Sequence, residues 1–161
     1  MKNTQLIAYV ICGFIGAGKT TFARKLEHET GAIRITKDEW MIKIFGSKIT
    51  TDANFERYDK LVTELATDIA FKILKSGNDV ILDEGFWVKS QRDEIKKNIL
   101  QAGAKPIIYY VESSIALMKE RVINRSKNPP IDSFEINEDM FDNYLKYWEP
   151  PTREEDVFIV T

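Results

Sequence analysis

The residues best placed to do chemistry lie in one glycine-rich stretch, residues 13–21, with the sequence GFIGAGKTT. The stretch fits the pattern G-x-x-x-x-G-K-[ST], which forms a phosphate-binding loop when a strand precedes it and a helix follows. Glycines let consecutive backbone N–H groups turn toward one anion, and the following helix adds the positive end of its dipole. An apolar segment, 6–11, precedes the loop, and a helix-like segment, 21–27, follows it. The stretch therefore predicts a site for the phosphates of ATP.

Within this loop, the lysine and the hydroxyl residue after it have separate predicted roles. Lys19 reaches the β- and γ-phosphates as a point charge, and Thr20 offers its hydroxyl to Mg²⁺. ATP and Mg²⁺ are thus the predicted cofactors. The residues predicted to hold the nucleotide are Gly13, Phe14, Ile15, Gly16, Ala17, Gly18, Lys19, Thr20 and Thr21.

Two carboxylates follow predicted strands. Asp83 ends the apolar run VILD, and Asp38 comes shortly after the run AIRIT. A carboxylate beside the phosphate loop can hold Mg²⁺, usually through water, so Asp83 is the predicted metal ligand, with Glu84 as an alternative or helper. Asp38 is the predicted general base, because a carboxylate on the acceptor side can take a hydroxyl proton during phosphoryl transfer. The structural alternatives are that Asp83 caps the next turn and that Asp38 is a helix N-cap.

Several arginines and tryptophans are further candidates. Arg121 and Arg125 lie four residues apart on one face of a predicted helix, just before a Pro-Pro loop. Two guanidinium groups there can clamp phosphate oxygens and stabilise transition-state charge; surface ion pairing is the alternative. Arg92, near the start of its helix, is a third candidate for phosphate work. Trp40 and Trp87 follow the two carboxylates, and they either shape an acceptor pocket or pack in the core.

The order of the predicted elements brings these residues to one edge of a sheet. Short apolar strands alternate with helices, which indicates an α/β fold with a parallel sheet covered on both faces. Ligands bind beyond the carboxyl ends of the strands in such sheets. The predicted strands are 6–11, 32–36, 79–83, 105–111 and 157–160; the predicted helices are 21 to about 31, 37–46, 54–76, 90–102 with Ser90 as N-cap, 114–126 with Ser113 or Ser114 as N-cap, and 137–147. The region around 121–136 is a candidate lid on this single domain, residues 1–161.

Composition limits the class of protein. The chain has 161 residues, 43% of them apolar and 30% charged, which is ordinary for one globular domain. Its net charge of -2 gives no overall basic field for nucleic acid. The one cysteine, Cys12, cannot form an internal disulfide, which fits a reducing cytosol and a packing role. No signal peptide and no apolar run of about 20 residues is visible, so we expect a cytoplasmic protein, monomeric or homodimeric, without membrane contact.

Four motifs together resemble a known family. GFIGAGKTTFARKL, ITKDEW, VILDEGFW and MKERVINR look like the small P-loop kinases of the AAA_33 type, which include zeta toxins, chloramphenicol phosphotransferase and the kinase domain of phage polynucleotide kinase. The resemblance covers nearly the whole chain. It implies a three-layer α/β/α P-loop NTPase with sheet order 2-3-1-4-5, ATP with Mg²⁺, a lid that carries Arg121 and Arg125, and Asp38 as the residue that deprotonates an acceptor hydroxyl. The pattern of Phe86, Trp87 and Arg92, with the late YWEPPTREED, is similar to bacterial ATP-binding proteins.

One position departs from the family pattern. Polynucleotide kinases have an arginine three residues after the acidic residue, where it helps to bind the acceptor's phosphate, and this chain has Met41 there. The departure favours an uncharged, partly apolar hydroxyl compound as acceptor. The main hypothesis is therefore an ATP-dependent kinase that phosphorylates a hydroxyl of a small molecule. The alternatives are a nucleotide-dependent regulatory ATPase or binding module, and a nucleic-acid 5′-hydroxyl kinase.

Overall fold

The computed structural model describes residues 5–128, 130 and 133–161, which form an α/β fold. The five strands are β1 (Ile7–Cys12), β2 (Ile33–Ile35), β3 (Val80–Gly85), β4 (Lys105–Val111) and β5 (Phe158–Val160). The α-helices are α1 (Lys19–Thr30), α2 (Lys37–Phe45), α3 (Phe55–Lys75), α4 (Lys89–Gln101), α5 (Ile115–Lys127) and α6 (Glu138–Leu145). Two short 3-10 turns, Ile49–Thr51 and Arg153–Glu155, complete the described elements.

The strands form one parallel sheet in the order β2-β3-β1-β4-β5, as predicted. β1 lies at its centre, with Val10 opposite Leu82 on β3 and opposite Ile108 on β4. Because all five strands run the same way, their carboxyl ends meet at one edge. The phosphate loop, the start of α2 and the end of β3 therefore converge there.

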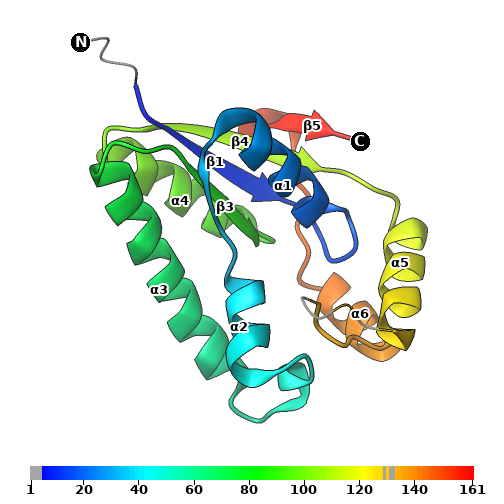
Figure 1. Cartoon of the computed structure of the whole chain (residues 1–161). Coiled ribbons are helices and arrows are strands. Elements are labelled where there is room, and N and C mark those ends of the chain that lie inside the picture. The colour runs from blue at the N-terminus through cyan, green and yellow to red at the C-terminus, as the bar shows by residue number, and fades with distance from the viewer. Residues whose placement is uncertain (1–4, 129, 131–132) are drawn as a thin grey trace.

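Both faces of the sheet are covered by helices, because β1 is apolar on both sides. Ala8, Val10 and Cys12 pack on one face with α3 and α4, and Tyr9 and Ile11 pack on the other with α1, α5 and α6. Successive side chains of a strand point to opposite faces, so one strand serves two cores. Figure 1 shows α1 in front of the sheet and α4 behind it, which gives the predicted three layers.

The inner face of α3 differs from the simplest pattern in the sequence. Phe55, Tyr58, Val62, Leu65, Ile69 and Ile73 recur at helical spacing and predict the core-facing stripe. In the structure Leu65 is 52% exposed, whereas the small residues Ala66 and Ala70 are buried between Val62 and Leu74. Alanines let the helix lie close to the sheet, and large apolar residues flank the contact.

Most helix ends agree with the sequence, and one does not. Gly31 ends α1 in the left-handed conformation, with φ of 71°, and the Ser114 side chain accepts a hydrogen bond from Leu117 N at the start of α5. The prediction of Ser90 as an N-cap is wrong, because α4 begins at Lys89 and its N-cap is Val88. Of the candidate lid around 121–136, residues 129, 131 and 132 lie outside the described residues. The described helices include none that is long and apolar enough to cross a membrane.

Candidate active site

The phosphate loop is held in a shape that only glycine permits at several points. Gly13 N donates a hydrogen bond to Gly85 O on β3, with an N···O distance of 3.0 Å. A Cβ atom at Gly16 would lie 2.6 Å from Met118 O, and Gly16 also has a positive φ of 80°. Gly18, with φ of 102°, begins α1 in the left-handed conformation. The glycines of the motif are thus required by close backbone approach and by φ, as expected of a loop that wraps an anion.

The side chain of Phe14 anchors the loop to the molecule's interior. It is fully buried, and its ring lies 4.9 Å from that of Trp87 and 5.2 Å from that of Phe141, centroid to centroid. Its carbonyl accepts a hydrogen bond from Lys19 Nζ at 2.9 Å. The lysine is therefore folded back over the loop that it serves. Burial lowers the pKa of this ammonium group, while the nearby carboxylates Asp83 and Asp38 oppose that shift.

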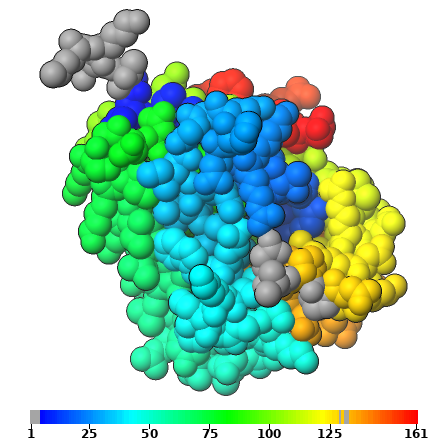
Figure 2. Space-filling view, in the orientation of Figure 1, coloured from blue at the N-terminus to red at the C-terminus, as the bar shows by residue number. Residues whose placement is uncertain are grey.

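A cavity of about 450 Å³ opens at the carboxyl edge of the sheet. It is lined by the phosphate loop and the first turns of α1 and α2, by the end of β3 and the loop after it, by the end of α5, and by α6. Figure 2 shows the face on which α1 (blue) lies above α2 (cyan), with α5 (yellow) at the right. This volume falls within the range of small-molecule sites.

Asp38 lies in the first turn of α2 and lines this cavity. The N-cap of α2 is Thr36, so Asp38 is inside the helix and its alternative role as an N-cap is excluded. Burial raises the pKa of Asp38, and the positive charges of Lys37 and Lys19 oppose that shift. A carboxylate whose pKa moves toward neutrality is a more effective proton acceptor near pH 7.

Asp83 lines the same cavity from the end of β3 and is 4% exposed. Its Oδ2 atom accepts a hydrogen bond from Arg34 Nη1 at 3.2 Å. Burial raises the pKa of Asp83, against the opposing charges of Lys19 and Arg34. Thr20 also lines the cavity. A hydroxyl and one carboxylate fit Mg²⁺, which takes one or two protein ligands and otherwise binds water and phosphate.

Glu84, the predicted helper for the metal, lines the cavity beside Asp83. Burial raises its pKa to about 7, and the charge of Lys37 opposes that shift. Its Oε1 atom is buried and has no hydrogen-bond partner among the described residues. Within the described part of the chain, no group of three or more carboxylate, thiol or imidazole side chains is arranged to hold a metal ion. A metal at this edge would therefore depend on few protein ligands.

Arg34 is a site residue that the sequence predictions missed. Its guanidinium contacts Glu27 on α1 at 3.3 Å, Glu39 on α2 at 3.0 Å and Asp83 on β3 at 3.2 Å. Its side chain is only 10% exposed. The available signal was an arginine between two isoleucines in a short strand, because a charged residue in such a strand needs buried partners.

The two arginines of α5 do different things. Arg125 lines the cavity, and its charge acts on Lys19. Arg121 is exposed, lies outside the described lining, and donates hydrogen bonds from Nη1 to Gly16 O at 3.2 Å and Ala17 O at 3.5 Å. Arg125 is thus placed beside the phosphate loop's lysine, whereas Arg121 holds the backbone of the loop itself.

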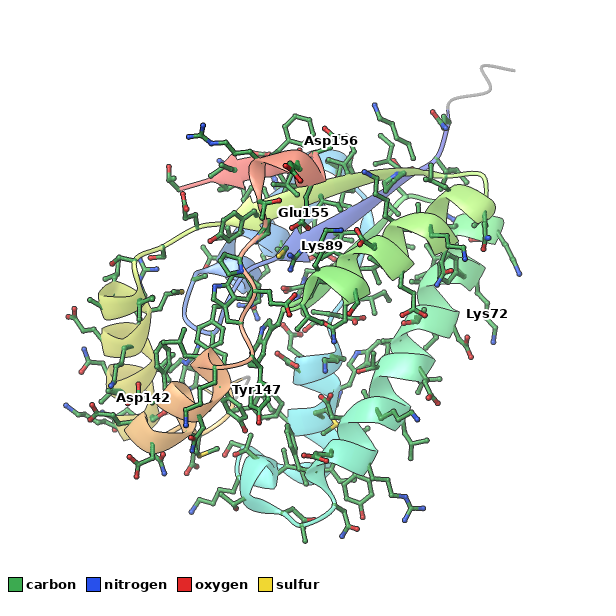
Figure 3. All side chains as sticks on the ribbon, turned by 180° about the vertical axis from the view of Figure 1, so that it is seen from behind. Lys72, Lys89, Asp142, Tyr147, Glu155 and Asp156 are labelled. Carbon is green, nitrogen blue, oxygen red and sulfur yellow. The ribbon has the colours of Figure 1, made fainter. Side chains whose placement is uncertain are left out.

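Arg92 does not reach the cavity, which corrects its candidacy for phosphate work. It is 1% exposed, and its guanidinium donates to both carboxylate oxygens of Glu155 and to the carbonyls of Phe86, Trp87 and Glu149. The start of α4 faces the segment before β5 rather than the phosphate loop, so these bonds use the guanidinium to join two loops. Figure 3 shows Glu155 beside the start of α4.

Some of the aromatic residues line the cavity, and others pack in the hydrophobic core. Trp87 lines the cavity, and its ring lies 5.8 Å from that of Tyr144 on α6, centroid to centroid. Tyr147, which Figure 3 shows between α6 and α2, is also part of the wall. Trp40 instead packs against the buried clusters beneath α3 and α2. Of the two tryptophans predicted to shape a pocket, only Trp87 does so among the described residues.

Comparison with known proteins agrees with this fold. The AAA_33 family model, described as an AAA domain, matches residues 9–151. A proposed kinase from Chloroflexus aurantiacus has a similar structure, with a TM-score of 0.73 and 19% identity over 98% of this chain and 88% of that one. Chaetomium thermophilum Kti12 in complex with ADP-AlF3 has a TM-score of 0.70 and 19% identity over 96% and 88%. A chain of the Pnkp1/Rnl/Hen1 RNA repair complex has a TM-score of 0.69 and 18% identity, over 91% of this chain and 46% of that one. No curated protein matches the chain in sequence.

Proposed function

The chain belongs to the AAA_33 family of AAA domains, and on that premise we propose that it is an ATP-dependent phosphotransferase that transfers the γ-phosphate to a hydroxyl of a small molecule. One observation carries the proposal. Lys19 of the phosphate loop and Asp38 of α2 line the same cavity, and the charge of each acts on the pKa of the other. A donor-phosphate ligand and a buried carboxylate thus share one enclosed space, which is what phosphoryl transfer to a hydroxyl requires.

The part of the cavity beside the phosphate loop is its donor half, where ATP would bind. Its backbone N–H groups and Lys19 would bind the phosphates of ATP, and Arg125 would add positive charge near the transferred group. Thr20 and Asp83 would hold Mg²⁺, which supplies positive charge between the phosphates when it is bound. Arg34 fixes the Asp83 carboxylate, and Arg121 fixes the loop backbone.

The part of the cavity around Asp38 is its acceptor half, where the hydroxyl compound would bind. Its carboxylate would take the proton of the acceptor hydroxyl as that oxygen attacks the γ-phosphorus. The new O–P bond forms while the bond from the γ-phosphorus to the β–γ bridging oxygen breaks, and ADP leaves with the electron pair. The raised pKa of Asp38 suits this role, since a weakly acidic carboxyl group holds the proton better.

The nucleic-acid kinase alternative has little support from this site. Met41 is fully buried in a cluster with Ile49 and Val62, so the position at which polynucleotide kinases carry an arginine faces the core. The regulatory alternative, an ATPase or binding module without a small acceptor, predicts no use for the acceptor half of the cavity. A cytoplasmic location and a monomer or homodimer remain part of the proposal, and the buried, free thiol of Cys12 is consistent with a reducing compartment.

Acceptor-dependent ADP formation tests the proposed function. In a coupled assay with ATP and Mg²⁺, we expect the correct hydroxyl compound to raise ADP formation by about tenfold or more over the rate without acceptor. The Lys19→Ala protein should form no ADP, either with or without the acceptor. Equal rates with and without every acceptor would support the regulatory alternative.

A further inference from the structure

The acceptor half of the cavity has an unusual balance of charge. Beyond Asp38, its described lining includes Asp59 on α3 and Glu84 at the end of β3, while Lys37 is the one described cation on this side. Lys37 Nζ already contacts Asp59 Oδ1 at 2.6 Å. One ammonium group therefore faces three carboxyl groups, and the buried Glu84 Oε1 atom has no hydrogen-bond partner among the described residues.

Aromatic side chains form the rest of this half. Trp87 follows β3, Tyr144 belongs to α6, Tyr147 follows α6, and Phe55 and Phe134 complete the described aromatic wall. The electron-rich faces of aromatic rings attract organic cations, and a tryptophan face is the strongest of these. Carboxylates and aromatic rings around one cavity favour a cationic group of the ligand and disfavour an anionic one, which would need a positive partner.

We propose that the acceptor is an amino alcohol or amino sugar, with a protonated amine that lies between the Glu84 carboxyl group and the aromatic wall while its hydroxyl faces Asp38. This inference rests on the proposed function and names the substrate class of the same cavity. It replaces the uncharged acceptor expected from Met41, because Met41 is buried in the core and takes no part in the wall. The donor half keeps the positive groups, Lys19 and Arg125, for the phosphates.

Matched acceptors test the inference with the full chain, ATP and Mg²⁺. Glucosamine, glucose and gluconate form one set; kanamycin and its fully N-acetylated form make another, which keeps the hydroxyls and removes the charge. We expect kcat/KM for the amine to exceed that for its neutral counterpart by about tenfold or more, with the carboxylate poorest. Equal use of charged and neutral acceptors, or a preference for gluconate, would overturn the inference and leave the phosphotransferase intact.

Variants separate the amine site from the chemistry. Glu84→Gln should lower the ratio of kcat/KM for the amine to kcat/KM for its neutral counterpart about tenfold, and this ratio cancels any common effect of the substitution on Mg²⁺. Glu64→Gln and Asp68→Asn, at exposed positions of α3, are the matched controls and should leave this ratio unchanged. Equilibrium dialysis of the same probes with a non-hydrolysable ATP analogue distinguishes the two proposals. Amine binding without any transfer would overturn the proposed function alone, and binding that is equal for N-acetylated and free amines would overturn the amine site.

Discussion

Arg92 and Glu155, 63 residues apart in the sequence, are joined by two hydrogen bonds, Nε to Oε2 at 2.6 Å and Nη2 to Oε1 at 2.9 Å. The pair is buried, with side-chain exposures of 1% and 5%. The same guanidinium donates to Glu149 O, and Glu149 N donates to Trp87 O. One ion pair thus fixes the loop after β3, which contains the cavity-lining Trp87, to the segment before β5, and it joins Trp87 and Arg92 to the late stretch YWEPPTREED of the same chain.

Breaking this pair should destabilise the fold strongly. For Glu155→Gln we expect the free energy of unfolding to fall by about 3 kcal/mol, because removing one partner leaves a buried charge without compensation. Glu154→Gln, at an exposed neighbouring position, should change it by about 0.5 kcal/mol or less. Urea unfolding of the three proteins measures both values. Equal stability of the two variants would show that the Arg92 pair does not hold the loops.

Arg34 should act through Asp83 on the metal. Arg34→Lys keeps the charge but loses the guanidinium geometry that reaches Glu27, Glu39 and Asp83 together. We expect the Mg²⁺ concentration for half-maximal transfer to rise about tenfold, with kcat at saturating Mg²⁺ reduced less. Arg57→Lys, on the exposed part of α3, is the control. An unchanged Mg²⁺ dependence would remove Arg34 from the metal site.

Asp38 should affect turnover far more than nucleotide binding. Asp38→Asn retains size and polarity but cannot accept the hydroxyl proton, so kcat should fall by about 10²–10⁴-fold. The Kd for ATP, measured by calorimetry, should change by about twofold at most, since the loop and Lys19 bind the phosphates. Unchanged turnover would exclude Asp38 as the base.

The stability of the free protein should depend on pH through Glu84. Burial raises the pKa of Glu84 to about 7, so the folded state binds this proton more tightly than the unfolded state does. Protonation of Glu84 therefore makes its full contribution to the free energy of unfolding below a pH of about 4.5, and this contribution is lost as the pH rises through about 7. Glu84→Gln should raise the unfolding free energy by up to about 3 kcal/mol at pH 8 and by little at pH 4.5.

Urea unfolding of the metal-free and nucleotide-free protein between pH 4.5 and 8 checks this dependence. Glu64→Gln, at an exposed position, should leave the pH profile unchanged. A Glu84→Gln protein that is less stable than the parent at pH 8 would show that the ionised carboxylate is a structural partner instead. In that case Lys37 would be the group that compensates its charge.

The sequence predicts the fold and the edge at which the site lies, because both follow from local patterns. The glycine motif defines the end of β1, and the apolar runs before Asp38 and Asp83 define two more strand ends. In a parallel sheet those ends must meet, so three residues far apart in the sequence can be brought to one edge without coordinates. The cavity lined by Lys19, Asp38 and Asp83 agrees with that expectation.

The remaining features depend on long-range contacts that no local pattern encodes. Arg34 reaches Asp83 across 49 residues, and Arg92 reaches Glu155 across 63. The helical repeat places Arg121 and Arg125 on one face, but it does not predict that Arg125 lines the cavity while Arg121 lies outside it. Within the predicted stripe of α3, Leu65 is the wrong member for a related reason, because hydrophobicity favours Leu65 over Ala66 whereas close packing on the sheet favours the alanine.

Transfer of the γ-phosphate is the most direct test of the central claim. γ-Labelled ATP with Mg²⁺ is incubated with pooled hydroxyl compounds: aminoglycosides, phenicols, nucleosides, sugars, amino-sugar nucleotides and 5′-hydroxyl oligonucleotides. The phosphotransferase predicts label on one chemical class, with none when Lys19→Ala replaces the parent protein. Tight ATP binding with only slow phosphate release, equal with and without every acceptor, would contradict it and favour a nucleotide-dependent regulatory module.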